Sequence, residues 1–421
     1  MRLLYGHCVD IIDPMSNGAF FKIENLSFAA IVGSLLLLAG CDSASHGGDA
    51  TRIEYQFIVP VSSQRIGTDL EEHGTSIVLG SSGHFILGGW LDGGGLPCDE
   101  TVGNPALFRG QSMLDSPIVE IYRDSREGSI EQLVTSDQRT FGLRWIRNRT
   151  GACSAERHVE LVSIDENGET SLLWQGIQGW NKNTVLQSLT GGVFSLVRTG
   201  TIEDTSVESY SSDGTLLWAY RADQAEYMVD AHGDNRGRLH LLSQEPGGAI
   251  WITVLSSGGT VQSRFSVEAD SFRVASKIVG SHNGSTILGY LRSQAGENTE
   301  MFATRFDQHG DASWHHRQSS KSPSAKPSTL LGLPNGQTVI GYTLTGDDDR
   351  FQRAAVQLVL LDQKGDVKSS AAFGEDGQTV LLNELVLSSD QEILAVGSIG
   401  PQHLWGAAND FDILVSRYIL Q

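Results

Sequence analysis

Basic residues, proline and long apolar runs are scarce in this sequence. Among its 421 residues, 30 Lys and Arg stand against 50 Asp and Glu, which gives a formal net charge of -20, and only 10 residues are Pro. Such an acidic excess opposes contact with nucleic acid or with anionic lipid headgroups. Few prolines and only 19% charged residues also argue against a disordered chain. The sequence therefore indicates a globular protein with a large core.

The familiar catalytic motifs are missing as well. The sequence contains no Gly-x-Ser-x-Gly elbow, no His-Glu-x-x-His pair, no phosphate loop and no complete EF-hand. His315 and His316 are adjacent, so on a strand they would point to opposite faces and could not comfortably chelate one metal. The sequence assigns no catalytic residue, although an active site assembled from scattered loops remains an open alternative.

One apolar run, residues 26–40, has the length of a signal-peptide core and is too short to cross a bilayer comfortably. It ends in Leu-Ala-Gly-Cys at Cys41, which resembles the bacterial lipobox. The resemblance implies a signal peptide over residues 1–40, with Met15 as the better start, and a lipid anchor with palmitate on Cys41. The alternative is a buried helix that happens to end at this cysteine.

The segment after the lipobox, residues 41–51, is small and polar and is expected to act as a tether. Several acyl chains on Cys41 would make membrane attachment practically permanent. We therefore expect a lipoprotein of the bacterial cell envelope that faces the periplasm or the exterior.

Turn residues recur through the rest of the chain, residues 52–421, at intervals of roughly 45 to 55 residues. One series of turns is followed each time by an alternating apolar run and lies at Gly83, Gln138, Gly192, Gly237, Gly284, Gly336 and Asp390. A second series lies between them at Gly110, Gly168, Gly214, Gly258, Gly310 and Gly365. The Asn-Gly and Asp-Gly pairs in these turns tolerate positive φ, which two-residue hairpins require. Each repeat is thus predicted to hold two hairpins.

Seven repeats of four strands predict an all-β fold, a single seven-bladed β-propeller of four-stranded antiparallel blades. The alternative is a pair of β-sandwiches. The last repeat is one strand short, because the chain stops after the run at residues 412–420. We expect the N-terminal strand at residues 53–61 to join the last blade and close the ring.

Two cysteines remain besides Cys41 and Cys8. Cys98 and Cys153 are predicted to lie in the second-to-third connections of the first two blades, which project from one face. Because an exported protein meets oxidising conditions, we predict a disulfide bond between them. Two free thiols are the alternative.

The repeats "SYSSDGTLLWAYR", "TRFDQHGDASWHHR" and "LLDQKGDVKSSAAF" resemble the propeller repeats of exported bacterial proteins, including delta-60-type and related lipoprotein repeats. The resemblance covers the chain from Thr51 onward and implies architecture but no activity. Gly-x-x-x-Trp at Trp218 and Trp314 also resembles the blades of quinoproteins, but the motif is irregular here. Packing of the outer strands against the next blade accounts for these tryptophans without a cofactor.

A partner surface is predicted on the face of the second-to-third connections. Trp405 would be an aromatic anchor there. Asp347, Asp348 and Asp349 would contribute polar contacts, and their oxygens suit calcium, whereas a solvated acidic turn is the alternative. No other cofactor is predicted.

These observations favour a lipid-anchored, non-catalytic binding or scaffold propeller, with a protein or polysaccharide partner and no nucleic acid. Two alternatives stay open. One is a propeller enzyme, either a quinoprotein-like oxidoreductase or a polysaccharide-cleaving enzyme. The other is an assembly factor for outer-membrane proteins, which resembles this chain only in fold and anchor.

Overall fold

The computed structural model describes residues 54–421 with short internal gaps, most of them between strands. The gaps are residues 68–70, 81–82, 95–101, 150–154, 178–182, 191–192, 200–205, 223–225, 247, 268–272, 282, 293–297, 320–323, 346–353, 375–377, 390 and 402–410. Within the described part, no helix is long and apolar enough to span a membrane.

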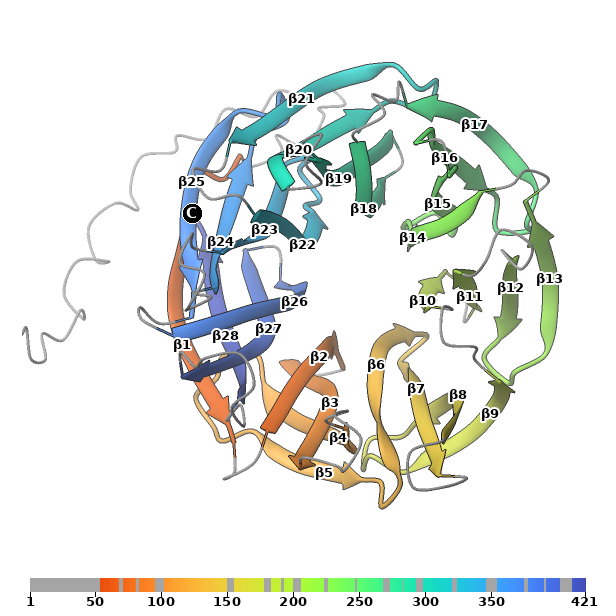
Figure 1. The fold of residues 1–421 in the computed structure, drawn as a ribbon, viewed down its shortest axis with the longest axis vertical. Helices are drawn as coiled ribbons and strands as arrows, with labels where there is room; N and C mark the ends of the chain where they lie inside the picture. The colour runs from red at the N-terminus through yellow and green to blue at the C-terminus, as the bar shows by residue number, and fades with distance from the viewer. Residues whose placement is uncertain are drawn as a thin grey trace, which may run out of the picture. The chain divides into compact units, whose positions relative to one another are not determined.

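The described chain folds into seven four-stranded antiparallel sheets arranged around an axis, which is a seven-bladed β-propeller (Figure 1). This confirms the predicted fold.

The strands of the first four blades are β2 (Glu71–Leu79), β3 (His84–Gly94), β4 (Val102–Gln111) and β5 (Val119–Arg123) in blade 1; β6 (Glu127–Ser136), β7 (Arg139–Arg149), β8 (Ala155–Ile164) and β9 (Thr170–Ile177) in blade 2; β10 (Asn183–Leu189), β11 (Val193–Thr199), β12 (Ser206–Ser211) and β13 (Leu216–Arg221) in blade 3; and β14 (Tyr227–Gly233), β15 (Leu239–Gln244), β16 (Ile250–Leu255) and β17 (Val261–Val267) in blade 4. The remaining strands are β18 (Arg273–Ser281), β19 (Gly284–Arg292), β20 (Asn298–Phe306) and β21 (Ala312–Ser319) in blade 5; β22 (Ser324–Gly332), β23 (Thr338–Thr345), β24 (Ala354–Leu361) and β25 (Val367–Phe373) in blade 6; and β26 (Gln378–Ser389), β27 (Glu392–Pro401), β28 (Asp412–Leu420) and β1 (Ile58–Ile66) in blade 7.

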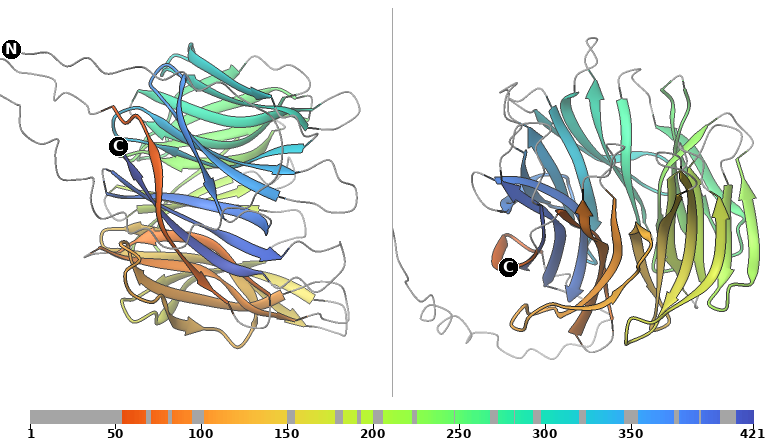
Figure 2. Two further views of the ribbon diagram at one scale, coloured as in Figure 1. Left: turned by 90° about the vertical axis from the view of Figure 1, so that its left-hand side faces the viewer. Right: turned by 60° about the horizontal axis from the view of Figure 1, so that its bottom comes forward.

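The two ends of the described chain meet in blade 7. Strand β1 runs antiparallel to β28 along the outer edge of that blade, from Ile58 opposite Leu420 to Ile66 opposite Ile413 (Figure 2). The predicted closure is confirmed, but the strand lies five residues later than the predicted 53–61. The apolar residues of "IEYQFIVPV" suggested a strand that begins at Ile53. The bounds of β1 are instead set by its pairing with β28.

Asp137 and Gln138 form a two-residue hairpin turn with positive φ at both residues, as predicted, but other hairpin turns differ from the prediction in their backbone. In the third-to-fourth turn of blade 2, Gly168 N–H donates to Asp165 O at 3.1 Å and Asp165 N–H donates to Glu169 O at 3.0 Å. Only the glycine of this turn has positive φ, at 86°, and Asn167 does not. The prediction of two-residue turns was therefore wrong here: the turn is a longer one that ends in a left-handed glycine. Gly110 was also misplaced, because it lies inside β4.

The apolar core is divided among the contacts between blades. The described residues form seven buried clusters, and each joins two neighbouring blades. In one of them Leu87 and Phe108 of blade 1 pack with Val396 and Val415 of blade 7. Burial of this surface is the main favourable term, and it exists only when blades stack.

Outer strands pack against the next blade through a repeated contact. A Cβ added at Gly259, in the third-to-fourth turn of blade 4, would lie 2.6 Å from the Trp218 ring of blade 3. At Gly365 of blade 6 it would lie 2.7 Å from the Trp314 ring of blade 5. Both glycines also have positive φ. The tryptophans thus pack outer strands as predicted, and the glycines leave room for them.

Removal of β1 tests the closure. A chain that begins at Thr68 is expected to be less stable than one that begins at Ala50 by at least about 3 kcal/mol, because β28 loses its ladder partner and the buried Ile58 is lost. Thermal melts of the two chains measure the difference. Equal melting temperatures would contradict the closure.

Candidate functional site

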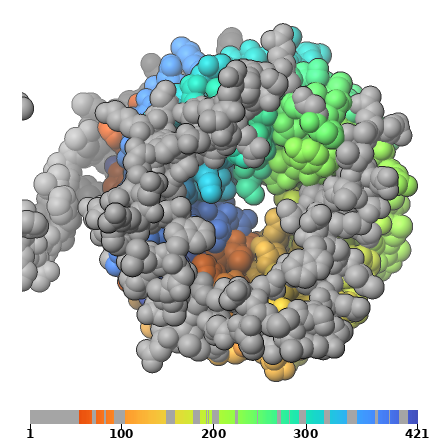
Figure 3. Space-filling model, viewed as in Figure 1, coloured from red at the N-terminus to blue at the C-terminus, as the bar shows by residue number. Residues whose placement is uncertain are grey.

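The ring surrounds a cavity at its axis. Figure 3 shows the molecule hollowed there, and the cavity has a volume of about 670 Å³. Its wall takes residues from the inner strand of every blade, for example Thr75 of β2, Gln187 of β10 and Lys277 of β18. A cavity of this size is in the range that holds a small molecule.

The cavity extends to one face of the ring. Its wall includes Asp234, Asn283 and Pro334, which lie at the first-to-second turns of blades 4, 5 and 6. The chain enters the ring on this same face, because Tyr55 N–H donates to Gln337 Oε1 and Gln337 Nε2 donates to Tyr55 O, both at 2.7 Å. We call it the short-turn face. The second-to-third connections leave from the opposite face, where β3 and its equivalents end.

The inner strands share a local irregularity that turns side chains toward the axis. In six of the seven the register shifts by one residue near the middle of the strand, and the residue after the shift lies at an equivalent place in each blade. These residues are Ser76, Gln132, Asp230, Lys277, Thr329 and Glu384. A bulge of this kind re-aims side chains. Strand β10 of blade 3 has no such shift.

Most of these side chains tie one blade to the next. Gln132 Oε1 accepts from Leu186 N–H at 2.6 Å, and Asp230 Oδ2 accepts from Ile278 N–H at 2.9 Å. Each acceptor lies on one inner strand, and each donor lies on the inner strand that follows. We call such a side-chain-to-backbone bond an axial tie.

The same ties cross from blade 7 to blade 1 and on to blade 2. Glu384 Oε2 accepts from Ile77 N–H at 2.8 Å and from the Ser76 hydroxyl at 2.6 Å. Ser76 Oγ in turn accepts from Leu133 N–H at 2.9 Å. In blade 3, which lacks the bulge, Gln187 Oε1 accepts from Gly233 N–H at 3.2 Å. Glu384 and Asp230, two acids of the cavity wall, thus help to hold neighbouring blades together.

Protonation at the axis departs from ordinary values. Burial raises the pKa of Glu384 to about 7, against the opposing effect of its hydrogen bonds with Ser76 and Ile77. Burial also raises the pKa of Asp230 and lowers the pKa of His232 to about 4. Lys277 acts on both acids as a nearby positive charge. The cavity wall therefore places Lys277 beside two acids, Asp230 and Glu384, whose pKa values are raised by burial.

A serine, a histidine and an aspartate align between blades 4 and 5. His240 Nδ1 lies 2.8 Å from Ser285 Oγ, and His240 Nε2 lies 3.3 Å from Asp234 Oδ2. The order resembles the hydrogen-bond line of a catalytic triad. All three residues are nearly inaccessible: His240 is 1% exposed, Ser285 is 2% exposed and Asp234 is 5% exposed. Asp234 is also paired with Arg238, whose Nη2 lies 2.6 Å from Oδ2. Although burial opposes it, hydrogen bonds from His240 and Arg238 hold the pKa of Asp234 well below its usual range.

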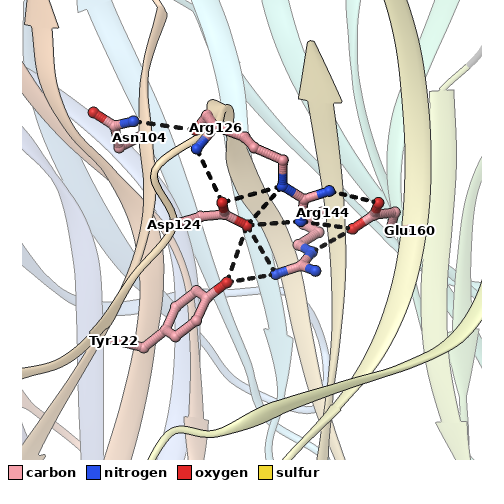
Figure 4. A network of polar contacts seen from close by, with 6 residues as sticks. All are labelled: Asn104, Tyr122, Asp124, Arg126, Arg144 and Glu160. Carbon is pink, nitrogen blue, oxygen red and sulfur yellow. Dashed lines mark hydrogen bonds and ion pairs between the residues drawn. The ribbon is translucent and has the colours of Figure 1, made fainter. Parts of the chain in front are cut away.

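A second polar network joins blades 1 and 2 away from the axis (Figure 4). Arg126 Nη2 and Arg144 Nη1 lie 2.7 and 3.3 Å from Asp124 Oδ2, and Arg144 Nε lies 2.7 Å from Glu160 Oε2. Hydrogen bonds from Arg126 hold the pKa of Asp124 at about 2 even though burial opposes this. Two cations and two anions balance one another, so this network is a structural link between blades.

The residues that the sequence singled out as sites cannot be placed against this geometry. Cys41, Cys98, Cys153, Asp347, Asp348, Asp349 and Trp405 all lie outside the described residues. The disulfide, the calcium site and the loop contact surface therefore stay predictions. Among the described residues, no group of three or more His, Cys, Asp or Glu is placed to hold a metal ion.

Sequence reasoning missed the axial residues. Asp230, Lys277 and Glu384 are polar residues within largely apolar inner strands, as in "YMVDAHG", "VASKIVG" and "LLNELVL". A charged residue inside such a strand was a usable signal. The bulge that turns it toward the axis was not readable from the sequence.

Comparisons with known proteins support the fold alone. No family model and no curated protein matches the sequence. Raptor from Chaetomium thermophilum matches over 87% of this chain and 30% of its own, with 9% identity and a TM-score of 0.52. The WD40 domain of Pan2 from Neurospora crassa matches over 86% of this chain and 96% of its own, with 8% identity and a TM-score of 0.50. A protein of unknown function from Dyadobacter fermentans matches over 86% and 99%, with 12% identity and a TM-score of 0.46.

The raised pKa of Glu384 predicts a pH-dependent stability. A carboxyl whose pKa is higher in the folded chain than in the unfolded chain contributes its full stabilisation when the pH is below the unfolded pKa. This contribution is lost as the pH rises through the folded pKa of Glu384, about 7. The lowered pKa of His232 has the opposite effect, because folding stability falls as the pH drops from the unfolded pKa of this histidine to about 4. We therefore compare wild type with Glu384→Gln, which keeps His232, Asp230, Lys277, Glu131 and Arg305 unchanged.

Lowering the pH from about 8 to about 5.5 is expected to stabilise wild type relative to Glu384→Gln by about 2 kcal/mol. Denaturant unfolding at the two pH values measures the change. If the two proteins responded to pH in parallel, Glu384 would not titrate near neutrality.

Proposed function

We propose that this chain is a lipid-anchored, non-catalytic binding or scaffold propeller of the bacterial cell envelope. The observation that carries the proposal is the opposition of two faces. The chain enters the ring on the short-turn face, where Tyr55 bonds with Gln337. The second-to-third connections follow strands that end on the other face, such as β27 at Pro401. The partner would bind on this other face, at the connection between β27 and β28 that contains Trp405.

The hydrogen bonds of the axial side chains also support binding rather than reaction. Glu384, Asp230 and Gln132 each accept a backbone hydrogen bond from the next blade. A side chain that holds the ring together is poorly suited to move during catalysis. A rigid closed ring is well suited to display loops, because loops carry function when a scaffold positions them. The partner class that we propose is a protein or an envelope polysaccharide.

Partner capture can be tested in membranes. A photo-crosslinking amino acid placed next to Trp405 is expected to give a discrete adduct in native membranes, identified by mass spectrometry. Trp405→Ala, or Asp347, Asp348 and Asp349 changed together to Asn, should reduce that adduct at least about fivefold without changing the melt. The matched control is Leu172→Ala, which removes an exposed apolar side chain near the start of the outer strand β9.

The anchor is tested in the same experiment. Cys41→Ser should abolish labelling by a palmitate analogue and release the protein from membranes. An adduct that persists unchanged in the Trp405 and aspartate variants, or wild type that takes up no lipid label, would contradict the proposal.

A propeller enzyme is the second candidate, and one observation favours it: the line of Ser285, His240 and Asp234. If this line were a hydrolytic triad, a fluorophosphonate probe would label Ser285, and Ser285→Ala would prevent labelling. Because the serine is 2% exposed and Asp234 is held by Arg238, we expect no labelling above that of Ser285→Ala. Labelling of wild type alone would make the enzyme the better proposal.

A further inference from the structure

The axial ties are interrupted in one sector of the ring, between β18, β22 and β26. Ladder hydrogen bonds in an antiparallel hairpin alternate, so every second inner-strand N–H turns to the axis. Leu333 N–H bonds Gln337 O in the turn of blade 6, so Leu331 is in the next hydrogen-bonded pair and Leu330 N–H turns to the axis. Ile278 N–H holds the same place in blade 5, where Asp230 accepts it.

Leu385 N–H turns to the axis in blade 7 for the same reason. Leu385 pairs with Ala395 as Ile77 pairs with Leu87 in blade 1. Ile77 N–H is accepted by Glu384. No side chain of the described residues accepts from Leu330 N–H or Leu385 N–H, in contrast to the equivalent groups at Ile77, Leu133, Leu186 and Ile278.

The side chains that precede these two groups explain the interruption. By the repeat of the ring, position 277 should cap Leu330 N–H and position 329 should cap Leu385 N–H. Lys277 is a donor only and cannot accept. Within the described part of the chain, Lys277 Nζ has no hydrogen bond or ion pair. Thr329 is 6% exposed, lines the cavity and has no hydrogen bond from its hydroxyl to the described residues. At Lys277 a donor therefore faces a donor, and at Thr329 the hydroxyl does not accept from Leu385 N–H. The acceptor for each N–H has to come from outside the described residues.

The charges around this sector restrict what the acceptor can be. Asp230 of β14 and Glu384 of β26 both act on Lys277 as opposite charges and line the same cavity. They would repel a doubly charged anion but would attract a cationic group beside a singly charged one. The wall also carries the amides of Gln132, Gln187 and Asn383. Its aromatic content is low, so a stacked sugar is disfavoured.

We propose that the axial cavity binds a small zwitterion of the amino-acid or short-peptide class, whose carboxylate accepts from Lys277 Nζ and Leu330 N–H while its ammonium group faces Asp230 and Glu384. The proposal rests on the binding function proposed above and adds a ligand to it. The tests of the two proposals can fail independently. The Lys277 variants described below do not change Trp405 and are not expected to change the crosslinked adduct in membranes.

Binding is measured by isothermal titration with three probes on the full folded chain. Alanyl-alanine is expected to bind saturably, with a dissociation constant below about 10 mM. Its C-terminal amide, which lacks the carboxylate, and its N-acetyl derivative, which lacks the ammonium group, should each bind about tenfold or more weakly. Inorganic phosphate should not bind measurably.

Two substitutions of one residue separate charge from fold. Lys277→Met keeps the apolar stem and removes the ammonium group, so alanyl-alanine affinity should fall about tenfold or more. Lys277→Gln supplies the acceptor that Gln132 supplies elsewhere, so it should abolish binding while the melting temperature stays level or rises. The matched control is Lys364→Met, at an exposed turn outside the cavity, which should bind as wild type.

Three results would overturn the inference. One is the absence of saturable binding of alanyl-alanine to wild type. Another is equal binding by wild type and both Lys277 variants. The third is a stronger response to phosphate than to alanyl-alanine, which would make the sector an inorganic anion site instead.

Discussion

The need to satisfy the inner edge of every sheet governs this fold. Each blade presents its first strand to the axis, and every second N–H on that edge lacks a partner within its own sheet. A buried N–H without an acceptor costs about as much as a lost hydrogen bond. The chain meets this cost with side chains from the preceding blade, such as Asp230 for Ile278 and Gln132 for Leu186. The bulge on the inner strands that carry them thus helps to close the ring, because it directs these side chains toward the N–H groups of the next blade.

Ties at the axis and apolar contacts between blades make neighbouring blades depend on one another. The buried clusters span pairs of blades, and the network of Asp124, Arg126, Arg144 and Glu160 adds a polar link between blades 1 and 2. Breaking a buried ion pair costs more than the pair contributes, so such links favour one arrangement over others. The shared sheet of β1 and β28 closes the sequence of contacts. A closed ring results, in which each blade is held between two neighbours and can position its loops.

The architecture was predictable from the sequence because its signals are local and repeated. Glycines such as Gly214 and Gly336 mark turns, and seven repeats fix the number of blades. The conformation of single turns was not predictable, since Asn167 and Gly168 suit two different turns equally well. Nor were the axial residues, because a one-residue bulge decides whether Lys277 or its neighbour Ser276 faces the axis. That choice depends on pairing between strands, which leaves no mark on a single sequence.

Lys277 departs from the pattern of axial ties that Gln132, Asp230 and Glu384 follow. A glutamine there would accept from Leu330 N–H and would complete the ties, as Gln132 does for Leu186. The lysine, which is half-buried, instead places a positive charge beside a backbone donor, and repulsion between the two donors opposes folding. Departures from local consistency that lower stability are found where a protein binds or reacts. The flanking acids offset part of this cost, and a carboxylate from outside would offset the remainder. We therefore infer the class of the ligand from Lys277, because this residue weakens the contact between blades 5 and 6 and a bound carboxylate would restore it.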